Sequence, residues 1–145
     1  MIDFQSVSQL FLAICLGALI GLEREYKKKE AGLRTYSMVA LGTCFFTIIS
    51  SEMVNFFIGK LGMAFDPIRV IQAVVIGVGF LGAGVIFRQP SGVVGITTAA
   101  GLWVVASIGI AVGIKLYFLA TVTTFLTLLV LSGFGLLEQK IFKKD

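Results

Sequence analysis

Two groups of charged and hydroxyl side chains could do chemistry, and each lies beside apolar stretches of the chain. The first group, the polar cluster, combines carboxylates, arginines and threonines: Glu23, Arg24, Glu25, Arg34, Thr35, Arg88, Thr97 and Thr98. Carboxylates and guanidiniums form charge-assisted, often bidentate hydrogen bonds, so the cluster predicts an ionic network that holds helix ends together. A Mg²⁺ site is the alternative, because Glu23 and Glu25 offer the oxygen ligands that this ion prefers. Three neighbouring arginines would repel the ion and favour the network.

The second group, Asp66, Arg69 and Gln72, stands at the start of an apolar stretch. Asp66 precedes Pro67, and this pair is typical of a helix N-cap followed by proline at the first helical position. Gln72 follows about one turn into the helix, where a buried amide needs a hydrogen-bond partner. We therefore expect Gln72 to face the other helices. No acidic residue lies in the middle of an apolar stretch, which argues against a conventional ion pump.

The composition excludes several kinds of catalytic and cofactor site. The chain has no histidine, which is the commonest general base and the commonest zinc ligand. Its two cysteines, Cys15 and Cys44, are too few for a structural zinc site. Residues 77–82 formally match the dinucleotide motif G-x-G-x-x-G, but no acidic residue follows about twenty positions later, as that motif requires. The sequence therefore predicts neither an enzyme nor a bound cofactor.

The elements that position these groups are five apolar stretches, at about residues 7–22, 35–51, 68–87, 97–114 and 116–137. The chain of 145 residues is 57% hydrophobic and 14% charged, and its mean hydropathy is +0.99. Soluble domains average roughly 25% charged residues, so this composition could not cover a water-facing surface. Each stretch is close to the ~20 residues that a helix needs to cross a bilayer. The sequence predicts an all-α, polytopic membrane protein of about five transmembrane helices, in a single domain over residues 1–145.

The distribution of Lys and Arg predicts the orientation of these helices. With the N-terminus outside and the C-terminus in the cytoplasm, the inner segments hold nine basic residues and the outer segments hold three. This bias satisfies the positive-inside rule. It depends on a break between the last two stretches at residues 113–115. Lys27, Lys28 and Lys29 lie next to the membrane in this arrangement, so we expect them to attract anionic lipid headgroups rather than nucleic acid.

Small residues recur at helical spacing and predict close packing between helices. They are Gly17 and Gly21 in the first stretch, Gly77, Gly79, Gly82 and Gly84 in the third, and Gly109 and Gly113 in the fourth. Small residues at this spacing let two membrane helices approach closely. Because the third stretch carries them on two faces, we expect its helix to lie at the centre of the bundle. The total small-residue surface exceeds what one five-helix bundle needs, which predicts a homodimer.

Four motifs follow one another along the chain and form a recognisable series. They are Gly17-Ala-Leu-Ile-Gly-Leu-Glu-Arg-Glu25, Ala31-Gly-Leu-Arg-Thr35, Gly77-Val-Gly-Phe-Leu-Gly-Ala-Gly-Val-Ile86 and Gly95-Ile-Thr-Thr-Ala-Ala100, followed by Leu102-Trp103. Together they resemble the MgtC/SapB family of bacterial membrane proteins, from about residue 10 to residue 113. The resemblance implies a small, multi-pass protein of the bacterial inner (plasma) membrane, linked in some members to growth at low magnesium. Longer members carry a soluble C-terminal domain, whereas only residues 138–145 follow the last stretch here.

On this resemblance, we expect a non-enzymatic membrane protein that modulates magnesium-linked ion homeostasis or membrane energetics. It would act through contacts within the membrane, with a second copy or another membrane protein as its partner. An ion channel or transporter is the alternative, with Mg²⁺ as the first candidate ion. A water-filled cavity lined by Gln72, Asp66 and the inner arginines would favour transport, whereas a tightly packed bundle would favour the modulator.

Overall fold

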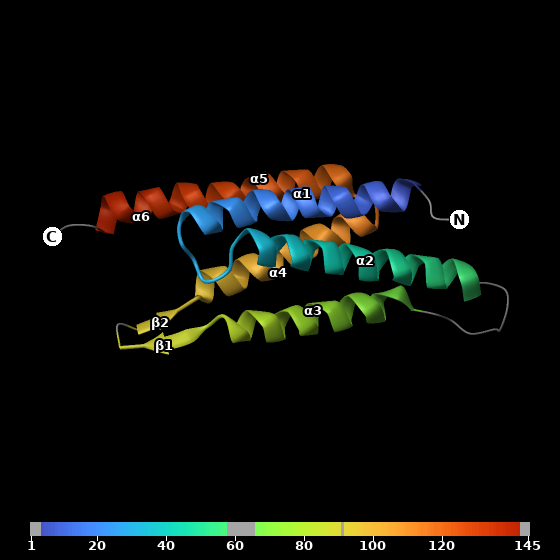
Figure 1. Ribbon diagram of the computed structural model, residues 1–145, viewed down its shortest axis with the longest axis horizontal. Coiled ribbons are helices and arrows are strands. Elements are labelled where there is room, and N and C mark those ends of the chain that lie inside the picture. The colour runs from blue at the N-terminus through green and yellow to red at the C-terminus, as the bar shows by residue number, and fades with distance from the viewer. Residues whose placement is uncertain (1–3, 58–65, 91, 143–145) are drawn as a thin grey trace.

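The computed structural model is an elongated bundle of helices and describes residues 4–57, 66–90 and 92–142 (Figure 1). In these residues, the helices are α1, Phe4–Tyr26; α2, Leu33–Phe57; α3, Pro67–Gly84; α4, Ile96–Gly113; and α5, Tyr117–Leu128, which continues through a π-helical turn, η1, Leu129–Phe134, into α6, Gly135–Phe142. Four segments are long and apolar enough to cross a membrane: α1, α2, α4 and α5 with η1. The apolar part of α3 is shorter. The predicted all-α, multi-pass membrane fold is confirmed.

The helices α1 to α5 alternate in direction, so their connections gather at two ends of the bundle (Figure 1). The C-terminal end carries the loop between α1 and α2, a short hairpin, and α6; the N-terminal end carries the start of α1 and the turn between α4 and α5. The described basic residues at the C-terminal end are Arg24, Lys27, Lys28, Lys29, Arg34, Arg88 and Lys140, and those at the N-terminal end are Arg69 and Lys115. The excess of basic residues at the C-terminal end of the bundle agrees with the positive-inside rule if that end is cytoplasmic.

The turn between α4 and α5 falls at residues 113–115, where a break between the last two apolar stretches is predicted. Helix α4 ends at Gly113, and Lys115 adopts a left-handed backbone conformation with φ of 67°. The N–H of Leu116 then donates to the carbonyl of Ala111 over 2.8 Å, which closes the last turn of the helix. The chain therefore reverses here, and the two stretches form separate antiparallel helices.

Helix α4 occupies the centre of the bundle and packs against α1, α2, α3 and α5. Its glycines allow the closest approach, which is to α2. A Cβ atom at Gly113 would lie 2.6 Å from Cβ of Thr47, and one at Gly109 would overlap the carbonyl oxygen of Ala40. The glycine side of α4 therefore packs directly on α2.

Helix α1 packs on α2 in the same way. A Cβ atom at Gly17 would lie 2.8 Å from Cβ of Ala40, and one at Gly21 would lie 2.7 Å from Cα of Leu33. Both glycines are buried. The small-residue face of α1 is therefore used inside the chain, and it leaves none of this surface for a second copy.

Helix α3 lies at the edge of the bundle, so the prediction that it would be central is wrong. Its main contacts are with α2 and α4. A Cβ atom at Gly77, Gly79 or Gly84 would meet no atom within 4 Å, and one at Gly82 would make an ordinary contact of 3.5 Å with Ala99. Small residues permit a close neighbour without requiring one, and at three of these four positions the described residues supply none.

A hairpin follows α3, so the prediction of a helix that continues to residue 87 is wrong at its end. Helix α3 ends at Gly84, and β1, Phe87–Gln89, pairs antiparallel with β2, Gly92–Val94. Gly95 follows with φ of 92°, and a Cβ atom there would overlap the carbonyl of Val85. A glycine in this conformation brings the chain back against the end of α3, so α4 begins close to where α3 ends.

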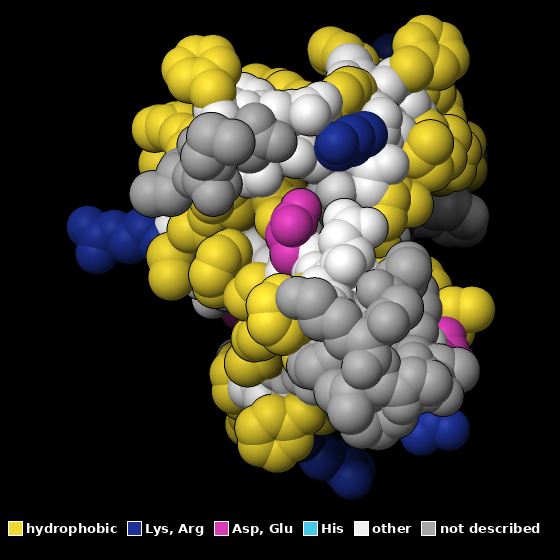
Figure 2. Space-filling model, turned by 90° about the vertical axis from the view of Figure 1, so that its right-hand side faces the viewer, with side chains coloured by type: hydrophobic (Ala, Val, Ile, Leu, Met, Phe, Trp, Pro, Cys, Tyr) yellow, Lys and Arg dark blue, Asp and Glu magenta, His cyan; other side chains and the backbone are white. Residues whose placement is uncertain are grey.

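The sides of the bundle are covered by hydrophobic side chains. Figure 2 looks onto the N-terminal end and shows these side chains around the rim, with separate Lys, Arg, Asp and Glu side chains between them. Phe11 of α1, Phe80 of α3 and Phe118 and Phe125 of α5 are each more than 60% exposed. A surface of this kind suits lipid rather than water.

Candidate functional site

A charged network lies at the C-terminal end of the bundle, with Arg24 and Thr98 at its centre. Arg24, near the end of α1, is only 3% exposed. Its Nη2 donates a hydrogen bond of 3.0 Å to Oγ1 of Thr98, in the first turn of α4. The hydroxyl of Tyr36, in α2, donates to the carbonyl oxygen of Thr98 over 3.1 Å. Three helices are therefore joined through one threonine.

Glu23 extends this network to η1, the π-helical turn between α5 and α6. Its Oε2 lies 3.8 Å from Nη1 of Arg24, and its Oε1 lies 2.6 Å from Nζ of Lys27. Ser132 donates its hydroxyl to the same Oε1 over 3.2 Å, and Lys27 also donates to the carbonyl of Leu131 over 3.0 Å. Both Leu131 and Ser132 belong to η1. A π-helical turn leaves carbonyls outside the regular helical ladder and is often found at functional sites.

Glu30 ties the loop between α1 and α2 to the same threonine. The Thr98 hydroxyl donates to Oε2 of Glu30 over 2.5 Å. This hydrogen bond to the ionised form is the main reason why the pKa of Glu30 is held below its usual value of 4.5. Thr98 thus accepts from a buried cation and donates to an exposed anion. Its hydroxyl is the shared link between Arg24 and Glu30.

The structure does not bring the whole predicted cluster together. Arg34, Thr35, Arg88 and Thr97 are exposed, and none of them forms an ion pair or a hydrogen bond with the network in the described residues. The predicted pairing of carboxylates with Arg34 and Arg88 is therefore wrong. On α2, the inward position belongs to Tyr36, so the two residues before it point outward.

Glu25 does not pair with an arginine in the described residues, contrary to the prediction from the polar cluster. It is exposed, and its Oε2 accepts the N–H of Leu33 over 3.0 Å, at the first residue of α2. A carboxylate at this place satisfies one of the free N–H groups of a helix start and favours its dipole. Glu25 therefore caps α2 instead of joining the ionic network.

Four members of the network were missed as such: Lys27, Glu30, Tyr36 and Ser132. Lys27 was assigned to lipid headgroups with its two neighbours, although a lysine four residues after Glu23 can pair with it on one helix. Glu30 and Tyr36 flank the predicted loop and the start of α2, where polar contacts to other helix ends are common. Ser132 carries no such signal, because its proximity to Glu23 depends on how α5 and η1 pack on α1.

The two carboxylates of the alternative Mg²⁺ site already have partners. Glu23 is held by Lys27 and Ser132, and Glu25 by the backbone of Leu33. The described residues contain no group of three or more His, Cys, Asp or Glu side chains that could hold a metal ion. The nearest charges to Glu23 are cations, which disfavour a bound Mg²⁺ at the same oxygens.

The second polar group lies at the opposite end. Asp66 caps α3 as predicted, because its Oδ1 accepts the N–H of Ile68 over 3.0 Å and proline follows it. Gln72 is exposed and has no hydrogen-bond partner in the described part of the chain, so the prediction that it faces the other helices is wrong. The reason is the position of α3 at the edge, where only one side of the helix has neighbours.

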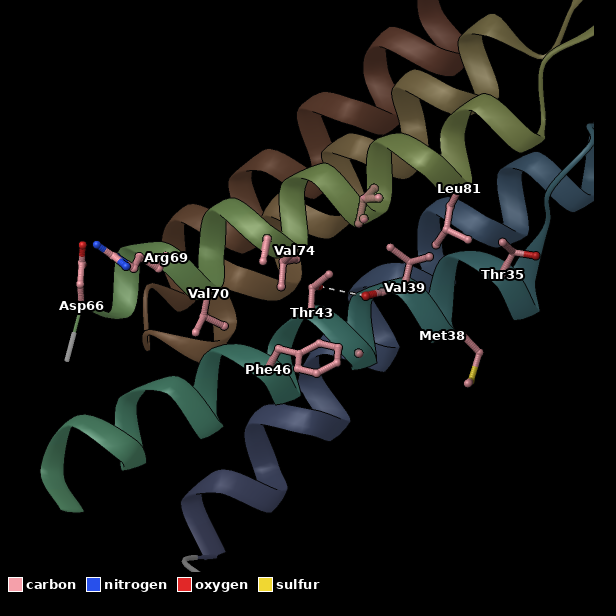
Figure 3. A pocket seen from close by; sticks show the side chains of 14 residues that line it. Thr35, Met38, Val39, Thr43, Phe46, Asp66, Arg69, Val70, Val74 and Leu81 are labelled. Carbon is pink, nitrogen blue, oxygen red and sulfur yellow. Dashed lines mark hydrogen bonds between the residues drawn. The ribbon is translucent and has the colours of Figure 1, made fainter. Parts of the chain in front are cut away.

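A groove of about 1250 Å³ separates α2 from α3 (Figure 3). Its walls are mainly apolar, and Asp66 and Arg69 stand together at its end near the start of α3. Gln72, Arg24, Arg34 and Arg88 do not line it. Thr35 of the predicted polar cluster lines the other end of the groove (Figure 3), but Glu23, Arg24 and Thr98 do not line it, so the groove does not reach the charged network.

Comparison with known proteins identifies the chain's relatives. The sequence profile of the MgtC family matches residues 10–140. The chain belongs to the MgtC family. The MgtC protein of Salmonella typhimurium is 42% identical over 114 residues, which cover 79% of this chain and 46% of that protein. SrpB of Synechococcus elongatus is 40% identical over 141 residues, which cover 90% of this chain and 75% of SrpB.

YhiD of Escherichia coli (strain K12), whose name proposes that it is a magnesium transporter, is 37% identical over 139 residues, which cover 96% of this chain and 65% of YhiD. This MgtC-family chain spans 59% to 65% of the length of such relatives from Haemophilus influenzae and Escherichia coli. No solved structure matches the chain significantly. Family membership and the apolar helices together make it a multi-pass membrane protein.

Proposed function

We propose that this MgtC-family protein is a non-enzymatic modulator of magnesium-linked ion homeostasis or membrane energetics in the bacterial inner membrane. Its family and the magnesium-related name of YhiD support the link to magnesium. The excess of basic residues at the C-terminal end of the bundle supports a cytoplasmic location of that end and an external N-terminus.

The packing of α4 is the observation that favours a modulator over a transporter. Val105, Ile108 and Val112 along this central helix are at most 1% exposed. The buried hydroxyls of Thr43 and Thr47 on α2 donate to carbonyls of their own helix, so both are satisfied without water; Thr43 also borders the mainly apolar α2–α3 groove. Transport routes normally expose polar or ionisable groups inside the membrane. A filled interior supports a protein that acts through its outer surfaces.

The proposed function is tested by separating magnesium flux from magnesium-dependent growth. Purified protein is reconstituted into liposomes that contain a Mg²⁺-sensitive dye, and influx is compared with that of empty liposomes. The same gene is expressed in a bacterium without its own MgtC-family genes, and growth is followed at limiting Mg²⁺. We expect altered growth without Mg²⁺ influx. Protein-dependent, saturable influx would instead support the channel or transporter.

Binding of Mg²⁺ to the network is tested on the same protein. A ligand that binds the folded state raises the unfolding temperature as its concentration increases. We expect no such rise up to millimolar Mg²⁺, because Lys27 and Arg24 already neutralise Glu23. A rise that disappears in the double variant Glu23→Gln/Glu25→Gln, and persists in Arg34→Ala, would contradict this expectation and favour an ion site.

A homodimer through α3 is the proposed assembly. Gln72, Ile76, Gly79, Phe80 and Ala83 are all exposed, and their spacing puts them on one face of α3. Glutamine can hydrogen-bond across two membrane helices, and small residues let them approach. Gln72→Leu should therefore reduce dimer cross-linking in liposomes more than the matched change Asn55→Leu in α2. Equal cross-linking in both variants would show that this face does not form the dimer.

A further inference from the structure

The α2–α3 groove is a trough in the side of the bundle that follows α3 from Asp66 to Leu81 (Figure 3). The 15 residue steps between them, at about 1.5 Å each, give a length of roughly 22 Å. Its depth comes from glycines, because Gly42 and Gly77 line it and a Cβ atom at either would meet nothing within 4 Å. The groove is thus built by missing side chains on both of its walls.

Within a bilayer this trough faces acyl chains. An empty groove would lose the dispersion contacts of its walls, so it must be filled. Lipid tails are as apolar as Val70 and Val74, which line the groove, and apolar walls alone therefore give no preference for one lipid over another. Any selectivity has to come from the polar end of the groove.

That end carries one anion and one cation on the same side of the groove. Figure 3 shows Asp66 and Arg69 next to each other where the groove begins. Asp66 uses Oδ1 to cap α3, which leaves Oδ2 for another donor. Arg69, one turn into the helix, is exposed and can hold an oxyanion with its fork of N–H groups. The polar end is therefore complementary to a group that bears one negative and one positive charge.

We propose that the groove binds one phospholipid with a phosphoethanolamine headgroup. The phosphate binds the Arg69 guanidinium near the N-terminus of α3, and the ammonium group donates to the free oxygen of Asp66. One acyl chain follows the groove past Gly77. Phosphatidylcholine lacks N–H donors for Asp66, and phosphatidylglycerol has no cation to pair with it. The length of roughly 22 Å exceeds half of the ~30 Å hydrocarbon core, so the groove can take a whole acyl chain.

A flexible acyl chain suits this groove, because its deepest places are open only where Gly42 and Gly77 lack side chains. An acyl chain can adapt its shape to such a floor.

The test is native mass spectrometry of the full chain, released from detergent after incubation with equal amounts of phosphatidylethanolamine, phosphatidylglycerol and phosphatidylcholine. Bound lipid is counted per protomer. We expect one retained phosphatidylethanolamine in preference to the other two. Gly77→Leu fills the groove without a clash and should reduce this retention about tenfold, which corresponds to ~1.4 kcal/mol. The matched control Gly79→Leu lies on the other face of α3, which is the proposed dimer face, so it should change dimer cross-linking but retain the lipid counted per protomer.

Two charge variants test the headgroup. Asp66→Asn keeps an oxygen that can cap α3 but removes the negative charge. It should abolish the preference for phosphatidylethanolamine over phosphatidylglycerol, while total lipid retention persists through Arg69. Arg69→Gln should weaken retention of every phospholipid.

Four results would overturn the proposal. The wild type could retain the three lipids equally, or Gly77→Leu could retain as much lipid as Gly79→Leu. Asp66→Asn could leave the preference unchanged. Finally, Gly77→Leu could abolish dimer cross-linking without changing lipid retention, which would assign the groove to a second copy.

Discussion

The hydroxyl of Thr98 is the smallest group whose removal should break the charged network. Thr98→Val replaces the hydroxyl with a methyl group and leaves the volume of this fully buried side chain almost unchanged. It removes the bond from Arg24 and the bond to Glu30 together. Thr97→Val is the matched control, because the same change is made one residue earlier at an exposed position.

The expected loss follows from what each partner does afterwards. Arg24 is 3% exposed and its Nε already lacks a hydrogen bond in the described residues, so its ion pair with Glu23, at 3.8 Å, is too long to replace the lost hydrogen bond. A hydrogen bond to a charged group contributes about 1.5–3 kcal/mol, and water cannot replace it at a buried site. Glu30 is exposed and can bind water instead, so the loss of its hydrogen bond to Thr98 adds little to the loss of folding free energy. We expect Thr98→Val to destabilise the fold by about 2–3 kcal/mol, and Thr97→Val by less than about 0.5 kcal/mol.

The measurement is reversible unfolding in mixed micelles, with SDS as the denaturant and far-UV circular dichroism as the signal. A double-mutant cycle with Arg24→Met assigns the loss, because the two residues should be strongly coupled. Equal losses for Thr98→Val and Thr97→Val would refute the network, since only one of these hydroxyls contacts it. Additive losses for Thr98→Val and Arg24→Met would refute the bond between them.

Three further outcomes are expected from other parts of the chain. Folding lowers the pKa of Glu30, so the ionised carboxylate stabilises the fold fully above about pH 4.5, its unfolded value, and this stabilisation is lost as pH falls through the folded pKa. Glu30→Gln should therefore remove this part of the acid dependence of the unfolding temperature. Gly109→Ala should cost about 1–3 kcal/mol in the same SDS titration because it meets α2, whereas Gly79→Ala should cost nothing. Cysteines replacing Lys28 and Lys115, in a background without the native cysteines, should react with impermeant reagents from opposite sides of the membrane.

The helices were predictable because their signal is local. Composition and the length of each apolar stretch suffice for membrane helices, and the break before Lys115 is marked by glycine and a charged residue. The hairpin was missed, although its signals were present: Gln89 precedes a proline, and two glycines follow within the next six residues. The residue before proline disfavours helix, and glycine is the residue that accepts the positive φ found at Gly95.

The sequence predicts at which end of the bundle the charged network lies, but not which of the polar side chains there contact one another. Sequence position indicates that Thr97 and Thr98 both start α4, but only the packing of α4 decides that Thr98 faces Arg24. The same limit applies to Gly77 and Gly109. Both are glycines in apolar helices, and one meets open space while the other touches the α2 backbone. The spacing of glycines along a helix does not indicate which of them contacts a helix from a distant part of the sequence.

The two candidate surfaces are built from different elements, and this makes them separable. The charged network takes its residues from α1, the following loop, α2, α4 and η1, and none from α3. The lipid groove needs α3, whose main contacts are with α2 and α4. Residues without shared partners have nearly additive effects. The double variant Thr98→Val/Gly77→Leu should therefore lose the stability of the first change and the lipid retention of the second, each by the same factor as alone. A lipid loss caused by Thr98→Val alone, at a temperature where the protein stays folded, would show that the network and the groove are coupled through α4.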